Sequence, residues 1–225
     1  MRTPARRPAP DALLDQGARA LGLSLTREQT DRFRMYREEM LRWATHMNLT
    51  AFRSAEAIVR HGFLDALACA VLIAPEVRRV LDIGSGAGFP GIPLALARPG
   101  VAFTLIEASR KKISFLRHIV RTLGLTNATV VQGRAELLAG STPLAGAFDL
   151  ALARAVAPPA EQARLVRPYL AQGGVFLLQA GEHPFPTEEL EKIVAAGFLL
   201  EREVLLPTMP ELAARRLLVW RRPEA

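Results

Sequence analysis

The first third of the chain has the 3.6-residue periodicity of amphipathic helices. A first helix is expected over 11–21, and a capping-box pattern at Thr26 predicts the start of a second, longer helix. A third helix is expected from Ser54, a favourable N-cap residue, to Ile73. No strand pattern occurs in this part of the chain, so we expect a helical extension over 11–76.

From residue 77 onward, short apolar runs alternate with amphipathic segments. Strand–helix alternation is typical of a parallel sheet covered by helices on both faces. The last two strand candidates have no predicted helix between them and fit an antiparallel pair at the sheet edge. The predicted strands are 80–83, 102–107, 128–132, 150–153, 175–178, 199–206 and 217–220. We therefore expect an α/β domain with a seven-stranded, mostly parallel sheet over 77–225.

Composition supports one α/β domain with an appendage. The chain has 225 residues, half of them apolar and only 6% aromatic, so a large aliphatic core is available. It carries 29 basic and 22 acidic residues, a formal net charge of +7, and only three of the basic residues are lysines. This excess suggests a polyanionic partner, although an arginine bias can equally reflect the base composition of a genome.

A single cysteine, Cys69, lies in an apolar run over 66–74. One cysteine excludes an intrachain disulfide framework and a cysteine-rich metal site, and the run is shorter than the ~20 residues of a membrane span. The first ten residues are basic and lack the apolar core of a secretory signal. We expect a disordered tail over 1–10, a cytoplasmic protein without membrane contact, and no metal, because the four histidines are too scattered to be ligands.

The segment 80–91 carries the most specific chemistry. A predicted strand ends at 83, glycines follow at 84, 86, 88 and 91, and a helix begins. Glycine lets the backbone approach a ligand closely and turns helix N–H groups toward it, although a tight strand–helix turn alone also favours glycine. Phe89 stands where the dinucleotide fingerprint has its third glycine, and Asp82 would repel a pyrophosphate. An acid there suits a ligand with a cationic or hydroxylated end, such as S-adenosylmethionine.

Glu107 ends the second predicted strand, about twenty residues after this loop. A carboxylate at that place can accept hydrogen bonds from both ribose hydroxyls, or it can serve only as an acid at a helix N-terminus. Together with the glycine loop, it indicates an adenosine-containing cofactor at the carboxyl ends of the strands.

Motifs spread over about 11–220 resemble the glucose-inhibited division protein B family. Members of that family are bacterial guanine-N7 methyltransferases of small-subunit ribosomal RNA. The motifs are Asn48-Leu-Thr-Ala51, Leu64-Asp65, Asp82-Ile-Gly-Ser-Gly-Ala-Gly-Phe-Pro-Gly-Ile-Pro93, Arg110-Lys-Lys112, Phe115-Leu116, Gly133-Arg-Ala-Glu136 and Ala153-Arg-Ala155. The resemblance implies a class I methyltransferase fold, S-adenosylmethionine as cofactor, and methyl transfer to N7 of a guanine in 16S rRNA, at the family site guanine 527. The implied partner is 16S rRNA or a precursor of the small ribosomal subunit, bound by a monomer.

The resemblance also assigns site residues by position. For the cofactor these are Asp82, Gly84, Ser85, Gly86, Gly88, Phe89, Glu107, Ala108, Ser109, Ala135, Glu136 and Arg154. For the RNA they are Asn48, His61, Arg110, Lys111 and Lys112. Arg154 is expected at the mouth of the site, where it could contact the guanine edge, the cofactor carboxylate or a phosphate.

Arg110, Arg117 and Arg121 fall within about 40° of one another on a helical wheel. They form either a solvated helix face or a surface that contacts RNA, and the pattern leaves both open.

Guanine N7 carries a free lone pair and no proton, so its methylation needs alignment rather than a general base. The absence of an evident acid–base pair agrees with this chemistry. A cytosine-C5 enzyme would need a nucleophilic cysteine, which Cys69 in an apolar helix does not suit.

The chain departs from the family pattern at Gly62, Ala66 and Gln179, where a histidine, a serine and a lysine are customary. These departures leave two alternatives open. One is methylation of another RNA or a small molecule, and the other is a non-catalytic module that binds RNA or the cofactor.

Overall fold

Seven strands form one sheet in the computed structural model, which describes residues 8–140, 143–154, 157–180, 183–206, 208–210 and 212–224. The strand order is β3-β2-β1-β4-β5-β7-β6, parallel from β3 to β5, with β7 antiparallel to both of its neighbours. The strands are β1 Arg79–Ile83, β2 Ala102–Glu107, β3 Ala128–Gln132, β4 Phe148–Ala153, β5 Leu170–Ala180, β6 Leu199–Leu206 and β7 Arg215–Arg221. The predicted seven-stranded, mostly parallel sheet with an antiparallel edge is confirmed.

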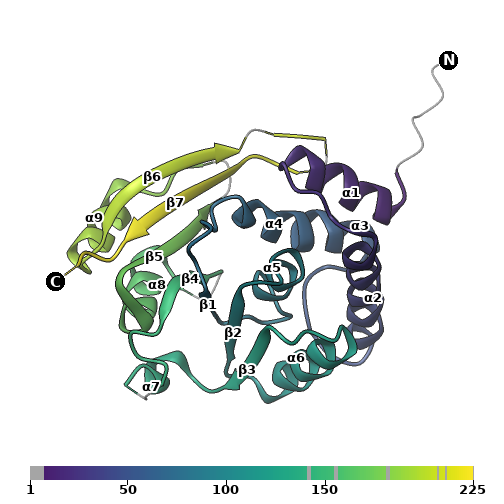
Figure 1. Ribbon diagram of the computed structural model, residues 1–225, viewed down its shortest axis with the longest axis horizontal. Helices are drawn as coiled ribbons and strands as arrows, with labels where there is room; N and C mark the ends of the chain where they lie inside the picture. Colours follow the sequence, from purple (N-terminus) through teal and green to yellow (C-terminus); the bar gives the residue numbers. More distant parts are fainter. Residues whose placement is uncertain are drawn as a thin grey trace.

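Helices cover both faces of this sheet (Figure 1). One face packs against α4, α5 and α6, with α1 and α2 outside them, and the other packs against α7, α8 and α9. The helices are α1 Pro10–Ala20, α2 Arg27–Ala44, α3 Ala55–Ala57, α4 Asp65–Ala70, α5 Gly91–Ala97, α6 Arg110–Thr122, α7 Ala135–Leu138, α8 Pro159–Val166 and α9 Thr187–Ala195. A π-helical segment, Ile58–Leu64, joins α3 to α4, and a 3-10 turn, Arg167–Tyr169, follows α8.

Alternating side chains of the strands supply the two halves of the core. On β1, Val80 faces the layer of α4 to α6, whereas Leu81 faces the layer of α7 to α9. Leu217 and Leu218 divide in the same way on β7. Because successive side chains of a strand point to opposite faces, nearly every position of the central strands is apolar and buried.

The predicted helix starts are confirmed by their caps. Thr26 Oγ1 accepts a hydrogen bond from Gln29 N at 3.2 Å, while Gln29 Oε1 accepts one from Thr26 N at 2.8 Å. Ser54 Oγ accepts from Ala57 N at 3.1 Å. The predicted third helix is instead three helical segments, since the π-helical turn interrupts it.

Helix α9 was not predicted, although Glu188 and Glu189 in its first turn and the buried Ile193 mark it as amphipathic. Most of the expected N-terminal tail lies outside the described residues, and its last residue, Pro10, begins α1. The division into 11–76 and 77–225 stays a prediction, since one continuous core cluster joins residues from both parts.

The π-helical segment brings Gly62 against the ring of Phe89 in the glycine loop. A Cβ atom at Gly62 would lie 2.6 Å from Phe89 Cζ and 2.9 Å from Cε1. The ring has little room to yield, because Tyr36, Phe52 and Phe63 surround it at centroid distances of 5.8 to 6.0 Å. Only glycine therefore fits between this helical segment and the loop.

We predict that Gly62→Ala lowers the free energy of unfolding by about 1–3 kcal/mol, because overpacking displaces Phe89. Gly100→Ala is the matched control, since nothing lies within 4 Å of a Cβ at that position. Urea unfolding of both variants measures the difference. Equal stabilities of the two variants would contradict the predicted contact.

Candidate active site

A cavity of about 570 Å³ opens at the carboxyl ends of β1, β2 and β4. This is the edge at which parallel α/β sheets bind ligands, and the volume is in the range of small-molecule sites. Its lining residues are Leu49, Thr50, Phe52, Ile83, Gly84, Ser85, Gly86, Ala87, Phe89, Ile106, Glu107, Ala108, Lys112, Gly133, Arg134, Ala135, Glu136, Arg154, Glu161 and Leu165.

The glycine loop forms one wall of the cavity. It begins where Gly84 N donates a hydrogen bond to Ile106 O at 2.8 Å, and it turns where Gly88 N donates to Ser85 O at 2.7 Å. Gly84, Gly86 and Gly88 have positive φ angles of 69°, 59° and 97°, a backbone conformation that favours glycine. These angles explain the repeated glycines, which also keep side chains out of the cavity.

Tyr36 of α2 holds this loop from behind. Its hydroxyl donates a hydrogen bond to the carbonyl oxygen of Ala87, a cavity-lining residue, and its ring stacks on Phe89 at 5.8 Å. Tyr36 is fully buried, and burial raises the pKa of its hydroxyl well above the usual value, so the group is a donor at physiological pH.

Asp82 lies beneath the loop rather than in the cavity wall. The residue is completely buried, and Oδ2 accepts a hydrogen bond from Gly91 N at 2.9 Å, at the first residue of α5. Burial raises the pKa of this carboxyl to about 6, against the opposing effect of the Gly91 hydrogen bond. In the structure the carboxylate therefore joins β1 to α5, and the predicted contact between Asp82 and a ligand stays a prediction.

Glu107 closes the same wall from β2. Its Oε2 accepts a hydrogen bond from Gly86 N at 2.9 Å, and its Oε1 accepts from Ser109 N at 2.8 Å. Only 8% of the residue is exposed, yet it lines the cavity. Each carboxylate oxygen has a second lone pair, so Glu107 can accept further hydrogen bonds from a ligand.

The opposite wall follows β3, where Ala135 and Glu136 begin α7. The Tyr169 hydroxyl donates a hydrogen bond to Ala135 O, and burial raises the pKa of Tyr169 to about 12. Two buried tyrosines therefore each donate a hydrogen bond to the carbonyl of a cavity-lining alanine. Tyr36 donates to Ala87, and Tyr169 donates to Ala135. Glu136 is paired with Arg134 at 3.4 Å.

Arg154 follows the last residue of β4 and lines the cavity. Its guanidinium carbon lies 5.1 Å from the centroid of Phe89, and NH1 donates a hydrogen bond to Asp65 Oδ2 at 3.1 Å. A cation over an aromatic ring and a carboxylate partner both restrict the side chain. Arg154 is therefore a preoriented cation at the cavity.

Asp65, on α4, is the hub of a larger buried cluster. Its Oδ1 accepts hydrogen bonds from Arg215 Nε and, at 3.1 Å, from Gln179 Nε2, which also donates to the Asp65 carbonyl at 2.9 Å. One carboxylate thus faces two guanidinium groups, which leaves a net positive charge beside the cavity. The Gln179 amide points at Asp65, and Gly181, two positions further along the chain, lies outside the described residues.

The structure brings most of the predicted site residues together. Those that line the cavity are Gly84, Ser85, Gly86, Phe89, Glu107, Ala108, Lys112, Ala135, Glu136 and Arg154. Asp82, Gly88 and Ser109 lie behind the lining, and Asn48, His61, Arg110 and Lys111 are exposed around it. Their roles toward ligands stay predictions.

Sequence reasoning did not identify Leu49, Thr50 and Phe52 as cavity residues. They follow Asn48 in the loop after α2, so the motif around Asn48 was the available indication. Arg134 was also missed, although it lies in the quoted motif beside Ala135. Glu161 and Leu165, on α8, were missed because their approach to the site depends on packing.

No helix in the described ranges is long and apolar enough to cross a bilayer. Those ranges also contain no cluster of three or more His, Cys, Asp or Glu side chains arranged to hold a metal ion.

We predict that Asp65→Asn lowers the free energy of unfolding by about 3 kcal/mol, because it leaves Arg154 and Arg215 without a counter-charge in a mostly buried place. Glu203→Gln is the control, since it breaks the more exposed pair with Arg216 on neighbouring strands and is expected to cost less than about 1 kcal/mol. Urea unfolding measures both, and a similar cost for the two substitutions would argue against the hub.

Known proteins with similar sequences share one description. The chain matches the profile of the family described as rRNA small subunit methyltransferase G over residues 29–211. It is similar to the ribosomal RNA small subunit methyltransferase G of Lachnoclostridium phytofermentans, with 35% identity over 91% of this chain and 85% of the relative. A protein of the same description from Roseiflexus castenholzii is 40% identical over 73% of this chain and 70% of the relative.

Solved structures with similar folds include the YcgJ protein of Bacillus subtilis, with a TM-score of 0.54, 17% identity, and coverage of 72% of this chain and 99% of that one. Another is a precorrin-6y C5,15-methyltransferase from Geobacter metallireducens, with a TM-score of 0.52, 17% identity, and coverage of 79% and 91%. At this identity the likeness concerns the fold alone, which is that of the class I methyltransferases. The sequence match covers most of the chain, and the chain belongs to the rRNA small subunit methyltransferase G family.

Proposed function

We propose that the protein transfers a methyl group from S-adenosylmethionine to N7 of a guanine in 16S rRNA, at the family site guanine 527. The observation that carries the proposal is the cavity of this family member, which joins the glycine loop, Glu107 and Arg154 at one edge of the sheet. The described chain has no membrane-spanning helix, and we further propose that it acts in the cytoplasm as a monomer.

The residues around the cavity fit S-adenosylmethionine. Glu107 offers lone pairs to ribose hydroxyls, and Ala135 and Glu136 frame the opposite wall, where we place the adenine. The loop from Gly84 to Ala87 leaves room for the methionine part. When bound, this cofactor supplies an electrophilic methyl group on a sulfonium.

The chain's own residues then have a limited task. Guanine N7 presents a lone pair and no proton, so no side chain has to remove one. The product carries a positive charge, which the mostly buried Glu107 carboxylate in the cavity wall favours. Arg154, held by Asp65 and Phe89, orients the substrate by donating hydrogen bonds to the guanine or to its phosphate.

Gln179 does not favour a methyl acceptor other than 16S rRNA. It stands where the family pattern has a lysine, but its amide nitrogen donates hydrogen bonds to Asp65. The residue does not line the cavity. Gly62 is likewise occupied in packing against Phe89. Both departures therefore have a structural explanation within this chain.

The test is methyl transfer in vitro from labelled S-adenosylmethionine to 16S rRNA taken from a strain that lacks this gene. The label is expected on N7-methylguanine of RNA freed of protein, at one position. Transfer to small molecules alone, or no transfer at all, would contradict the proposal.

A matched pair of variants tests the site. Glu107→Gln is expected to weaken cofactor binding at least tenfold, since hydrogen bonds to a charged acceptor contribute about 1.5–3 kcal/mol. Glu201→Gln changes an exposed glutamate that pairs with Arg221, outside the cavity lining, and is expected to bind the cofactor as the parent does. Calorimetric titration with S-adenosylhomocysteine measures both. Equal affinities would remove Glu107 from the site.

A further inference from the structure

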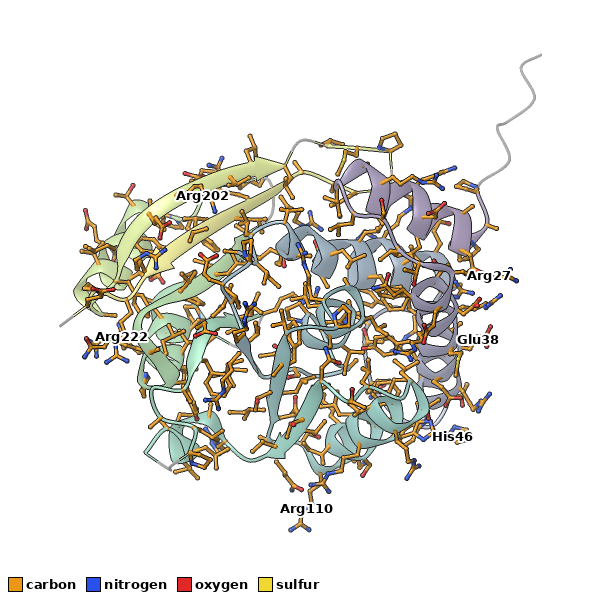
Figure 2. All side chains as sticks on the ribbon, viewed as in Figure 1. Arg27, Glu38, His46, Arg110, Arg202 and Arg222 are labelled. Atoms are coloured by element: carbon orange, nitrogen blue, oxygen red, sulfur yellow. The ribbon has the colours of Figure 1, made fainter. Side chains whose placement is uncertain are left out.

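Helix α6 carries an unusual concentration of unpaired charge. We call the basic side chains of this helix the α6 ridge: Arg110, Lys111, Lys112, Arg117 and Arg121. The helix contains no acidic residue, and none of the five has an ion-pair partner within the described ranges. Four of them are exposed, and Figure 2 shows Arg110 pointing away from the body of the molecule.

Helix α2, which packs beside α6, provides the comparison within the same protein. It also carries five arginines, and four of these form ion pairs. Arg32 lies 2.7 Å from Glu28, and Arg42 lies 2.8 Å from Glu39. The two neighbouring helices therefore differ in how their basic side chains are paired, although both are rich in arginine.

The first turn of α6 runs against the usual electrostatics of helices. The N-terminus of a helix favours acidic side chains, yet Arg110, Lys111 and Lys112 occupy this turn. The nearby acid is Glu107, whose Oε1 accepts a hydrogen bond from Ser109 N, at the N-cap. The three cations of the turn have no ion pair in the described chain, so they are available to an anionic partner.

Helix α6 begins beside the active site, where Lys112 in its first turn lines the cavity. Arg110, Arg117 and Arg121 lie together on another side of the helix and lead away from the cavity. At 1.5 Å per residue, the ridge extends about 16 Å from Arg110 to Arg121. At its far end lies a hollow of about 360 Å³, lined by Arg117, Arg121 and Thr126 together with apolar Val120, Leu125 and Val130. Guanidinium groups beside an apolar floor suit a nucleotide better than a bare ion.

We propose that the α6 ridge binds the phosphate backbone of the substrate RNA strand where it leaves the active site, with Arg117 and Arg121 as the distal contacts. This inference rests on the proposed function, because the target guanine places the RNA at the cavity from which the ridge begins. Each contact neutralises one phosphate and releases a counterion, so the binding depends on salt.

The test compares Arg117→Gln/Arg121→Gln with Arg32→Gln/Arg34→Gln. Both variants lose two charges from exposed or half-exposed helix faces, but the second loses arginines that are already paired with Glu28 and Asp31. Binding of a 16S rRNA transcript is measured between about 50 and 200 mM KCl. Each phosphate contact on a single strand contributes about 0.7 to the magnitude of the slope of log affinity against log salt. The ridge variant loses two contacts, so the magnitude of its slope is expected to be lower by about 1.4. The α2 variant is expected to keep the slope of the parent.

Kinetics provide the second measurement. The ridge variant is expected to raise KM for RNA about tenfold while kcat and the affinity for S-adenosylhomocysteine stay unchanged, and Arg117→Lys/Arg121→Lys is expected to restore the salt slope. Equal slopes and KM values for the ridge and α2 variants would overturn the inference. If the parent protein binds RNA through the ridge but transfers no methyl group, the proposed function is wrong and the inference about the ridge still holds.

Discussion

The hydrogen bond from the Tyr36 hydroxyl to the Ala87 carbonyl connects the N-terminal helices to the cavity wall. Around it, the ring of Phe89 is enclosed by aromatic side chains from α2, the π-helical segment and the loop at Phe52, and Gly62 makes room for that ring. The glycine loop has positive φ angles at three residues, and Tyr36 adds a hydrogen bond from outside the sheet to those that the loop makes itself. The N-terminal helices therefore support the glycine loop from outside the sheet.

The arginines of the described chain differ in whether they form ion pairs. Many arginines of the described chain are engaged in ion pairs, and two of them share the single carboxylate of Asp65. Near the cavity, the basic side chains without an ion pair in the described chain lie along α6, whereas Arg154 is held by Asp65. A net charge of +7 thus says less about the partner than the positions at which arginines lack acids.

The sequence predicted the sheet and most of its helices, because periodicity and glycine placement are local properties. The family resemblance assigned ten of the twenty residues that line the cavity. Tyr36, Asp65 and Arg215 were not identified as supports of the site. Their partners lie 51, 89 and 150 positions away in the chain, and no local pattern encodes such contacts. The contact of Asp82 with Gly91 on the next helix was also not predicted, and the contact of Asp82 with a ligand stays a prediction.

The measurement that tests this account most directly is the affinity of Tyr36→Phe for S-adenosylhomocysteine, determined by calorimetric titration of the full chain. Tyr36 does not line the cavity, and phenylalanine keeps the ring that stacks on Phe89. Leaving the Ala87 carbonyl without its donor is expected to loosen the loop and to weaken binding about three- to tenfold. An affinity equal to that of the parent would contradict the claim that the N-terminal helices support the glycine loop.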